Sequence, residues 1–353
     1  MNKLFINELH LKNFRIHQNI NFKFNKNIIF FIGNNAIGKT SILESIYYLA
    51  LTKSNRTKID QELIKFNEKF SLISLKESNN NYKIVISNRG KSCFINDKEI
   101  NKLSDYIGNL YVIFSSKEDF KIINGSPNIR RYFLNLEISI LDKTYLDILR
   151  KYNDILKDRN NLLKEKNIDY NYLDILDEQL TQYGIIIINK RNNFLKELNN
   201  YLNLVYKDIY NKESIKLIYK NNIDINNYLN ILKEKRDLDI QTSFTNYGPH
   251  RDDFELYLND LEINKYSSEG QKKLFIINLR IALLKYLEDK ININPILLLD
   301  DVFSDLDIIR QNNLIKYLNN NQTFITSTTI NNLDNNLLSK SQVFIYDKIW
   351  KEK

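Results

Sequence analysis

Residues 33–40 read Gly-Asn-Asn-Ala-Ile-Gly-Lys-Thr, and this stretch decides which fold the chain builds. It fits the pattern G-x-x-x-x-G-K-[ST], a loop whose backbone N–H groups surround the phosphates of a nucleotide. Lys39 is expected to reach the β- and γ-phosphates and to act in catalysis, and the Thr40 hydroxyl is expected to bind Mg²⁺. The expected nucleotide-binding residues here are Gly33, Asn34, Asn35, Ala36, Ile37, Gly38, Lys39, Thr40 and Ser41.

The residues on either side of this loop predict the structural context that it needs. The run Ile-Ile-Phe-Phe-Ile at 28–32 is continuously apolar, which is typical of a buried strand. From Ser41 to Ala50, apolar side chains recur at helical spacing. A strand, a glycine loop and a helix in this order place the phosphates at a helix N-terminus, where free N–H groups favour anions.

A pair of acids far along the chain predicts the metal-binding half of the same site. Residues 296–301 read Ile-Leu-Leu-Leu-Asp-Asp. A buried strand ending in two acids is suited to placing carboxylates beside a phosphate loop. We expect Asp300 to hold Mg²⁺ through water, together with Thr40, and Asp301 to orient and activate the attacking water.

A third motif, Ser-Ser-Glu-Gly-Gln at 267–271, begins a segment with apolar residues at helical spacing. Ser268 can cap this helix, which is an ordinary structural role, and the same hydroxyl and helix N-terminus can also bind a phosphate. The position of this motif shortly before residues 296–301 favours a role in the nucleotide site. We therefore expect Ser268, Gly270 and Gln271 to bind the nucleotide as well.

The apolar pattern predicts an α/β core that a helical segment interrupts. Strands are expected at 4–11, 22–24, 28–32, 70–76, 82–87, 92–95, 110–114, 254–258 and 296–299, with a final strand at 324–326. Two long helices are expected around 141–156 and 173–187, separated by a polar stretch at 164–170, with a short helix before 240 and another helix over 271–288.

Composition bounds the class of protein. The 353 residues are 43% hydrophobic and 27% charged, which is ordinary for a globular protein, and no run of about 18 apolar residues predicts a membrane span. One cysteine and three dispersed histidines argue against a disulfide and against zinc sites. The formal net charge of +8 favours a polyanionic partner, although a lysine-rich genome bias would give the same charge. We expect a soluble, cytoplasmic protein.

The order of the three motifs resembles that of ABC-type ATPases, in which the serine motif of one subunit closes on the γ-phosphate bound by another. Residues 304–307, Ser-Asp-Leu-Asp, match the D-loop of this class, and Thr328 stands where the class places a γ-phosphate sensor. The resemblance implies an α/β P-loop ATPase like an ABC or SMC head, with mixed sheets and a helical second lobe inserted in the core. The ATPase lobe would comprise 1–136 and 241–353, and the helical insertion 137–240.

Further motifs narrow the resemblance to the RecF family. They are Asn-Phe-Arg at 13–15, Lys-Ser-Asn-Arg-Thr at 53–57, Glu-Asp-Phe at 118–120, Gly-Ser-Pro at 125–127, Arg-Arg-Tyr-Phe-Leu at 130–134, Arg-Asn-Asn-Leu-Leu-Lys at 159–164 and Gly-Pro-His-Arg-Asp-Asp at 248–253. With 267–271 and 296–307 they run in order over nearly the whole chain. The sequence departs from the family at Lys117, where proline is usual, at Asn135, where an acid is common, and at Glu269 and Lys272 in the serine motif.

The resemblance implies an ATP-dependent DNA-binding protein of recombinational repair and replication restart, active in the SOS response to DNA damage. Two subunits would enclose two ATP molecules with Mg²⁺ and grip duplex DNA beside single-stranded gaps. The protein would act with RecR and RecO to load RecA, associated with the nucleoid when bound to DNA. Because Asp301 is one methylene shorter than the glutamate common in ABC-type ATPases, we expect weak, DNA-stimulated hydrolysis, with ATP acting mainly as a switch.

Three other classes of protein share the phosphate loop. An ATP-dependent nuclease needs an additional acidic cluster, and residues 137–240 offer only dispersed acids. An SMC-like coiled-coil protein needs a longer excursion than fits between Thr40 and Ser268, and a transporter ATPase would bind membrane partners. The motif at 248–253 stays open between a contact to nucleotide or DNA and a structural turn, which its Gly-Pro pair favours.

Overall fold

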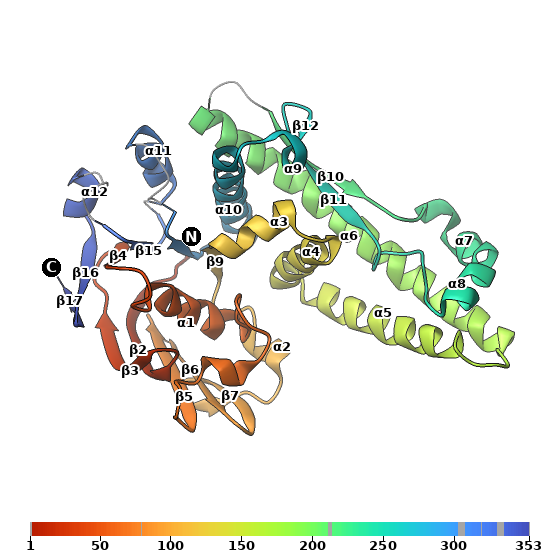
Figure 1. The fold of residues 1–353 in the computed structure, drawn as a ribbon, viewed down its shortest axis with the longest axis horizontal. Helices are drawn as coiled ribbons and strands as arrows, with labels where there is room; N and C mark the ends of the chain where they lie inside the picture. Colours follow the sequence, from red (N-terminus) through yellow and green to blue (C-terminus); the bar gives the residue numbers. More distant parts are fainter. Residues whose placement is uncertain are drawn as a thin grey trace. The chain divides into compact units, whose positions relative to one another are not determined.

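The computed structural model describes residues 2–78, 80–210, 214–302, 308–318, 320–329 and 335–352. The chain forms two compact units, which we describe separately. Unit 1 comprises residues 1–120, 204–212 and 268–353, and unit 2 comprises residues 121–203 and 213–267. Figure 1 labels the elements of both units. All residues predicted to form the nucleotide site belong to unit 1.

A six-stranded, mostly parallel sheet forms the centre of unit 1, in the order β17-β16-β4-β15-β14-β9. The strands are β4 (Ile28–Ile32), β9 (Val112–Ser115), β14 (Ile296–Asp300), β15 (Thr323–Ser327), β16 (Gln342–Asp347) and β17 (Ile349–Glu352). β4, β9, β14 and β15 are buried along their whole length, which explains their apolar runs. Because β4, β14 and β15 are parallel neighbours, their carboxyl ends meet at one edge of the sheet.

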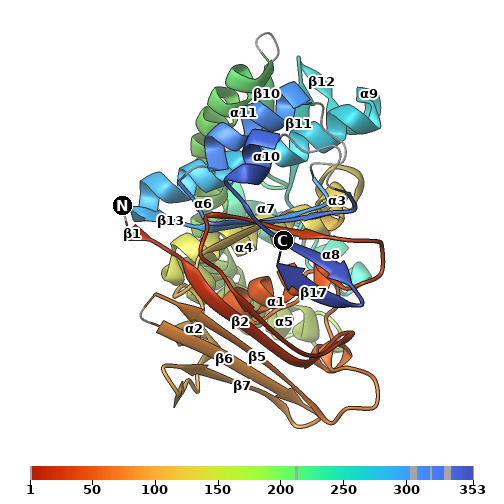
Figure 2. The ribbon, with the colours of Figure 1, turned by 90° about the vertical axis from the view of Figure 1, so that its left-hand side faces the viewer.

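A second, antiparallel sheet of unit 1 has the order β3-β2-β5-β6-β7-β8. Its strands are β2 (Ile6–Phe14), β3 (His17–Lys23), β5 (Phe70–Glu77), β6 (Asn80–Ser87), β7 (Gly90–Ile95) and β8 (Lys98–Glu99). Helix α1 (Lys39–Leu51) contacts strands of both six-stranded sheets, and most of its residues are buried (Figure 2). This double burial holds the start of α1 firmly at the edge of the parallel sheet.

Helix α10 (Glu269–Ile291) is fastened to the parallel sheet by an ion pair. Arg280 on α10 donates to both carboxylate oxygens of Asp119, at 2.7 and 3.1 Å. Asp119 ends η2 (Lys117–Asp119), the turn that follows β9, and also accepts from the backbone N–H of Ser116. The remaining elements are β1 (Asn2–Lys3), η1 (Asp60–Leu63), α2 (Leu103–Tyr106), β13 (Ile293–Asn294), α11 (Ile308–Leu318) and α12 (Asn335–Ser339).

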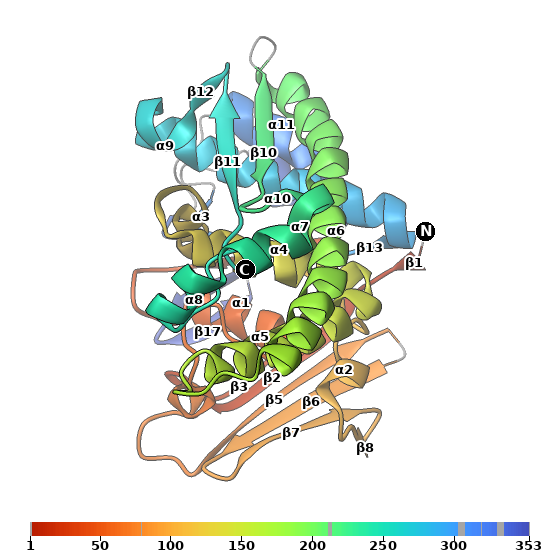
Figure 3. The ribbon, with the colours of Figure 1, turned by 90° about the vertical axis from the view of Figure 1, so that its right-hand side faces the viewer.

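Helices make up most of unit 2. They are α4 (Pro127–Leu141), α5 (Lys143–Leu162), α6 (Tyr170–Tyr210), η3 (Ile225–Asn227), α7 (Tyr228–Glu234), α8 (Arg236–Thr242) and α9 (Ile263–Tyr266), while α3 (Phe120–Asn124) begins at the unit boundary and α6 extends past residue 203. Helices α5 and α6 lie side by side (Figures 1 and 3). Leu162, Leu163, Leu173 and Leu176 form a buried cluster where the two helices meet.

A three-stranded antiparallel sheet completes unit 2, in the order β10-β11-β12. Its strands are β10 (Ile215–Lys220), β11 (Asp253–Leu258) and β12 (Leu261–Glu262). The side-chain amide of Asn199 on α6 exchanges two hydrogen bonds of 2.8 Å with the backbone of Leu217 on β10. This pairing holds the sheet along the long helix, as Figure 3 shows.

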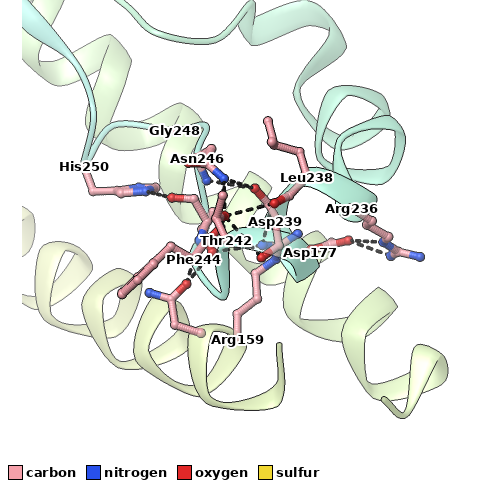
Figure 4. Close-up of polar contacts among 12 residues, drawn as sticks. Arg159, Asp177, Arg236, Leu238, Asp239, Thr242, Phe244, Asn246, Gly248 and His250 are labelled. Carbon is pink, nitrogen blue, oxygen red and sulfur yellow. Dashed lines mark hydrogen bonds and ion pairs between the residues drawn. The ribbon is translucent and has the colours of Figure 1, made fainter. Parts of the chain in front are cut away.

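A buried ionic network ties the helices of unit 2 to the loop before β11 (Figure 4). Arg159 on α5 is fully buried between Asp177 on α6 and Asp239 on α8, which are also 0% exposed. Its Nε lies 2.6 Å from Asp177 and its Nη1 lies 2.7 Å from Asp239 and 2.9 Å from the Thr245 hydroxyl. Arg236 binds the second oxygen of Asp177 at 2.6 Å. The network therefore joins three helices and the loop through charge-assisted hydrogen bonds.

The structure confirms the α/β core with mixed sheets and an inserted second unit that the sequence predicts. Unit 2 differs in its bounds from the expected 137–240 insertion, and it carries a sheet as well as helices. The strand β10 was missed because its six residues are too few to distinguish a strand from a helix by spacing. The prediction that 324–326 is the final strand was wrong, since β16 and β17 follow it, and the short apolar run of β16 is ambiguous for the same reason.

Candidate nucleotide-binding site

One cavity of unit 1 collects residues from distant parts of the chain. It has a volume of about 730 Å³ and lies where β4, β14 and β15 end. Its lining residues are Arg15, Ile16, Asn35, Ala36, Gly38, Lys39, Thr40, Ser41, Arg56, Gln61, Glu62, Ile64, Phe66, Lys117, Asp300, Asp301 and Thr326. The structure thus brings the phosphate loop and the Asp-Asp pair into one site, although 260 residues separate Thr40 from Asp300.

The turn from the loop into α1 requires glycine at position 38. Gly38 caps α1 with a φ of 93°, a left-handed conformation that side chains disfavour. A Cβ at this position would also lie 2.5 Å from Nε2 of His17. His17 is buried behind the loop, where its Nε2 lies 3.1 Å from the Gly38 carbonyl oxygen, and burial lowers the pKa of its imidazole. No motif in the sequence points to His17.

The ammonium group of Lys39 is held over the loop by backbone carbonyls. Its Nζ donates to the carbonyl oxygens of Gly33 at 2.5 Å and Asn34 at 2.7 Å. Burial lowers the pKa of Lys39, while the nearby carboxylates of Asp301 and Asp300 act in the opposite direction. Phosphate oxygens accept stronger, charge-assisted hydrogen bonds than carbonyls do, so Lys39 is positioned to exchange these partners for a phosphate.

Thr40, Asp300 and Thr326 form a connected set of oxygen atoms suited to Mg²⁺. The Thr40 hydroxyl lies 2.9 and 3.0 Å from the two carboxylate oxygens of Asp300, and the Thr326 hydroxyl donates to Asp300 at 2.8 Å. Burial raises the pKa of Asp300, whereas the hydrogen bonds from Thr326 and Thr40 lower it. In the described residues, no group of three His, Cys, Asp or Glu side chains could hold a metal alone. This set fits Mg²⁺, which is usually bound by one or two carboxylates together with substrate phosphates.

Asp301 reaches the same cavity because the strand breaks after Asp300. In a continuous strand, successive side chains point to opposite faces, so only one of the two acids would line the cavity. Asp301 instead has a φ of 57°, and its backbone N–H donates to the Thr326 hydroxyl at 2.9 Å. Its Oδ2 lies 3.2 Å from Nζ of Lys117, whose side chain is 76% exposed. Lys117 is one of the positions where the sequence departs from the family that it resembles, and it contacts Asp301, the residue expected to activate water.

Two arginines of the N-terminal motifs converge on one buried acid beside the loop. Glu44 on α1 is 0% exposed, and Arg15 binds both its carboxylate oxygens, at 2.7 and 3.0 Å. Arg56 pairs with the same carboxylate at 3.5 Å, and Ser54 donates to it at 2.5 Å. The motifs at 13–15 and 53–57 thus shape one wall of the cavity. Their role here could not be predicted from sequence, because nothing in their spacing points to Glu44.

The serine motif forms a helix start that does not line this cavity. Ser268 caps α10 by accepting from the Gln271 N–H at 3.3 Å, and Gln271 accepts from the Ser268 N–H at 2.9 Å. Ser268, Gly270 and Gln271 are exposed. Thr326 lines the cavity, whereas Thr328, the expected γ-phosphate sensor, does not line it. The expected D-loop, 304–307, lies outside the residues that the structure describes.

The motif at 248–253 belongs to unit 2, whereas the phosphate loop belongs to unit 1. Both carboxylate oxygens of Asp253 accept hydrogen bonds from the guanidinium group of Arg130, at 2.6 and 2.8 Å. The backbone oxygen of Asp252 accepts from Arg131. A Cβ on Gly248, whose φ is 131°, would lie 2.4 Å from the Tyr228 hydroxyl oxygen. These contacts show a structural role for the turn, and they join the motif to the arginines at 130–131.

In the described part of the chain, no group of three His, Cys, Asp or Glu side chains could hold a metal ion. In the same residues, no helix has both the length and the apolar character needed to span a membrane.

The family model and the relatives that the chain matches agree with one another. The family described as RecF/RecN/SMC N-terminal domain matches residues 5–348. The chain is 40% identical over 328 residues to the DNA replication and repair protein RecF of Acholeplasma laidlawii, covering 91% of this chain and 93% of that protein. It is 38% identical over 352 residues to the RecF protein of Clostridium perfringens, covering 97% and 98%.

Solved structures resemble the chain over its full length. A structure of the recombination mediator protein RecF with ATP, from the RecFOR pathway, has a TM-score of 0.91 at 31% identity, and covers 99% of this chain and 98% of its own. The SMC head domain of Pyrococcus furiosus has a TM-score of 0.58 at 14% identity, covering 99% and 96%, which shows a likeness of fold alone.

Proposed function

Since this chain belongs to the RecF family of DNA replication and repair proteins, we propose that it is an ATP-dependent DNA-binding switch of recombinational repair and replication restart. One observation carries the proposal. The cavity of unit 1 contains the phosphate loop, the oxygen set for Mg²⁺ and Asp301, while the serine motif is exposed outside that cavity. A second copy of the chain would supply Ser268 to the γ-phosphate, so ATP would join two subunits.

Different residues of the cavity would bind different parts of ATP and its metal ion. The loop N–H groups and Lys39 would bind the phosphates, and Thr40 with Asp300 would hold Mg²⁺. The metal would neutralise charge on the β- and γ-phosphates. Asp301 would orient a water for hydrolysis, and Thr326 would keep both acids in place through its two hydrogen bonds.

The net charge of the chain and its family both support DNA as a binding partner. A formal net charge of +8 favours contacts to the phosphate backbone, with steep salt dependence and little sequence preference. The RecF relative solved with ATP belongs to the RecFOR pathway. By this relation the chain would act with RecR and RecO beside gaps in duplex DNA and help to load RecA in the cytoplasm.

Replacement of Lys39 by alanine tests the nucleotide site. The loss of a charge-assisted contact to phosphate, worth about 1.5–3 kcal/mol, should weaken ATP binding by roughly 10- to 150-fold. Binding is measured by titration with a fluorescent ATP analogue, and ATP-dependent retention of duplex DNA by anisotropy. Lys69→Met, an exposed lysine on another segment, serves as the control. Unchanged affinity in Lys39→Ala would contradict the assignment of the cavity.

Lys117 offers a test of the catalytic assignment. Its ammonium competes with water for Asp301, and an exposed ion pair contributes up to about 1 kcal/mol. Lys117→Met should therefore raise steady-state phosphate release with DNA present, by up to about fivefold. Lys69→Met is again the control. A fall in turnover would show that Lys117 serves the phosphate instead of restraining Asp301.

A further inference from the structure

Unit 2 contains a cavity of its own, to which the proposed function assigns no role. Its volume is about 280 Å³, close to the lower end of the range of small-molecule sites, about 300 Å³. Its eleven lining residues come from α4, α5, α6 and the turn at 249–250, and include two arginines and three asparagines but no Asp or Glu. A lining without carboxylates does not suit a metal ion or a cationic ligand.

Two guanidinium groups give this cavity a positive character. Arg191 is almost fully buried and donates to the Pro249 carbonyl at 2.6 Å and to Asn135 at 2.9 Å. Its ion pair with Asp252 is long, at 3.9 Å, and Asp252 does not line the cavity. Arg131 donates to the Asp252 backbone oxygen. Burial and then the charge of Arg191 lower the pKa of Arg131, while Asp253 and Asp252 act in the opposite direction. Two guanidinium groups at one cavity favour the entry of an anion.

The three asparagines of the lining offer side-chain amide N–H groups as hydrogen-bond donors. The side-chain oxygen of Asn128 accepts from Arg131, and that of Asn135 accepts from Arg191. Because an arginine can only donate, these contacts fix which end of each amide is oxygen. Within the described residues, neither amide nitrogen has an acceptor, and the exposed Asn153 has no hydrogen-bond partner. Three amides are therefore available to a ligand at the cavity.

His250 lines the cavity with a neutral imidazole ring. Its Nε2 lies 2.9 Å from the Thr245 carbonyl oxygen, which can only accept, so the proton is on Nε2 (Figure 4). Its Nδ1 then accepts from the Tyr152 hydroxyl at 2.7 Å. Burial lowers the pKa of His250 to about 4, so the ring carries no charge at neutral pH. His250 therefore adds an uncharged ring to the lining of the cavity.

The lining also includes apolar and aromatic side chains. Leu149, Ile187 and Pro249 contribute hydrocarbon, and Tyr132 is 50% exposed. Exposed aromatic rings can stack on nucleobases, and arginine and amide groups bind phosphates and base edges. We propose that this cavity binds one nucleoside phosphate, either as a free mononucleotide or as an unpaired nucleotide of a DNA strand.

The test compares two exposed double variants. Tyr132→Ala with Asn153→Ala removes one exposed aromatic ring and one exposed amide from the lining of the cavity. Tyr172→Ala with Asn171→Ala removes the same side-chain types from an exposed site on α6 that does not line the cavity. All four positions are exposed, so both proteins should fold, which circular dichroism checks. The DNA measurement rests on the proposed function, and the free-nucleotide measurement does not.

The first probe is fluorescent DNA, measured by anisotropy at saturating ATP, which occupies the cavity of unit 1. Wild type should bind a duplex with an unpaired, 5′-phosphorylated end about tenfold more tightly than the blunt duplex, as one stacked base would provide. The cavity variant should lose this preference and keep its affinity for the blunt duplex, and the control variant should keep both.

The second probe is dAMP, followed by saturation-transfer NMR at saturating ATP. If dAMP binding is lost in the cavity variant while neither protein prefers the unpaired end, the natural ligand is a free nucleotide. If the cavity variant matches wild type with both probes, or the control variant loses as much, the proposal is overturned. Failure of wild type to retain blunt duplex with ATP would contradict the proposed function and leave the dAMP result to decide the cavity.

Discussion

Replacement of Ser268 by arginine is expected to abolish ATP-dependent dimerisation while ATP binding is retained. Ser268 is exposed at the start of α10 and does not line the cavity that holds the phosphate loop. In the proposed two-subunit site, a second copy of the chain would bring Ser268 to the γ-phosphate, and a long side chain there would keep the two subunits apart. Light scattering with and without ATP and duplex DNA measures the dimer, and a fluorescent ATP analogue measures binding.

Two further variants separate the phosphate contact from the helix cap. Ser268 caps α10, and loss of such a cap costs about 1 kcal/mol of stability. Ser268→Asp keeps a good cap but sets a negative charge against the γ-phosphate, so it should also remain monomeric. Ser268→Thr keeps both the hydroxyl and the cap and should dimerise. Dimerisation that is indifferent to ATP and to all three variants would refute the two-subunit site.

Replacement of Arg159 by leucine should destabilise unit 2 by about 3–5 kcal/mol. The substitution leaves Asp177 and Asp239 in the interior without the guanidinium that both carboxylates contact (Figure 4). Arg236 still binds Asp177, but Asp239 then loses its ion pair. Chemical denaturation followed by circular dichroism should show an earlier transition for the helices of unit 2.

The matched control for this prediction lies on the same helix. Arg150 on α5 pairs with Asp147 at 2.8 Å, but the two side chains are 71% and 62% exposed. Arg150→Leu should therefore change stability by less than about 0.5 kcal/mol. Equal effects of the two substitutions would show that the buried network does not stabilise unit 2 beyond a surface pair.

The phosphate loop and the acid pair could be recognised from sequence because their chemistry is local. The spacing of Gly33, Gly38 and Lys39 is that of a loop with one conformation, and an apolar run before Asp300 indicates a buried strand. Each pattern is complete within about eight residues. The sequence could therefore name the loop and the two acids before any contact between them was known.

Other members of the cavity could not be found in this way. Arg15 and Arg56 lie on separate segments and meet only through Glu44, and Lys117 reaches Asp301 from the turn after β9. Thr326 lines the cavity where Thr328 was expected, because the end of β15 sets which hydroxyl faces Asp300. Side-chain direction at a strand end depends on register, and spacing alone does not determine register.

Residue type and spacing alone predict a loop of the phosphate-binding type at 33–40, acids after a buried strand at 300–301, and a helix start at Ser268. These are properties of short segments, in which residue type and spacing dictate the local backbone. Which segments share a site depends on how the strands pair in the folded chain. The parallel pairing of β4, β15 and β14 places the loop beside Asp300 and Asp301, and it leaves Ser268 outside their cavity. Strand order depends on contacts between residues hundreds of positions apart, which no local pattern records.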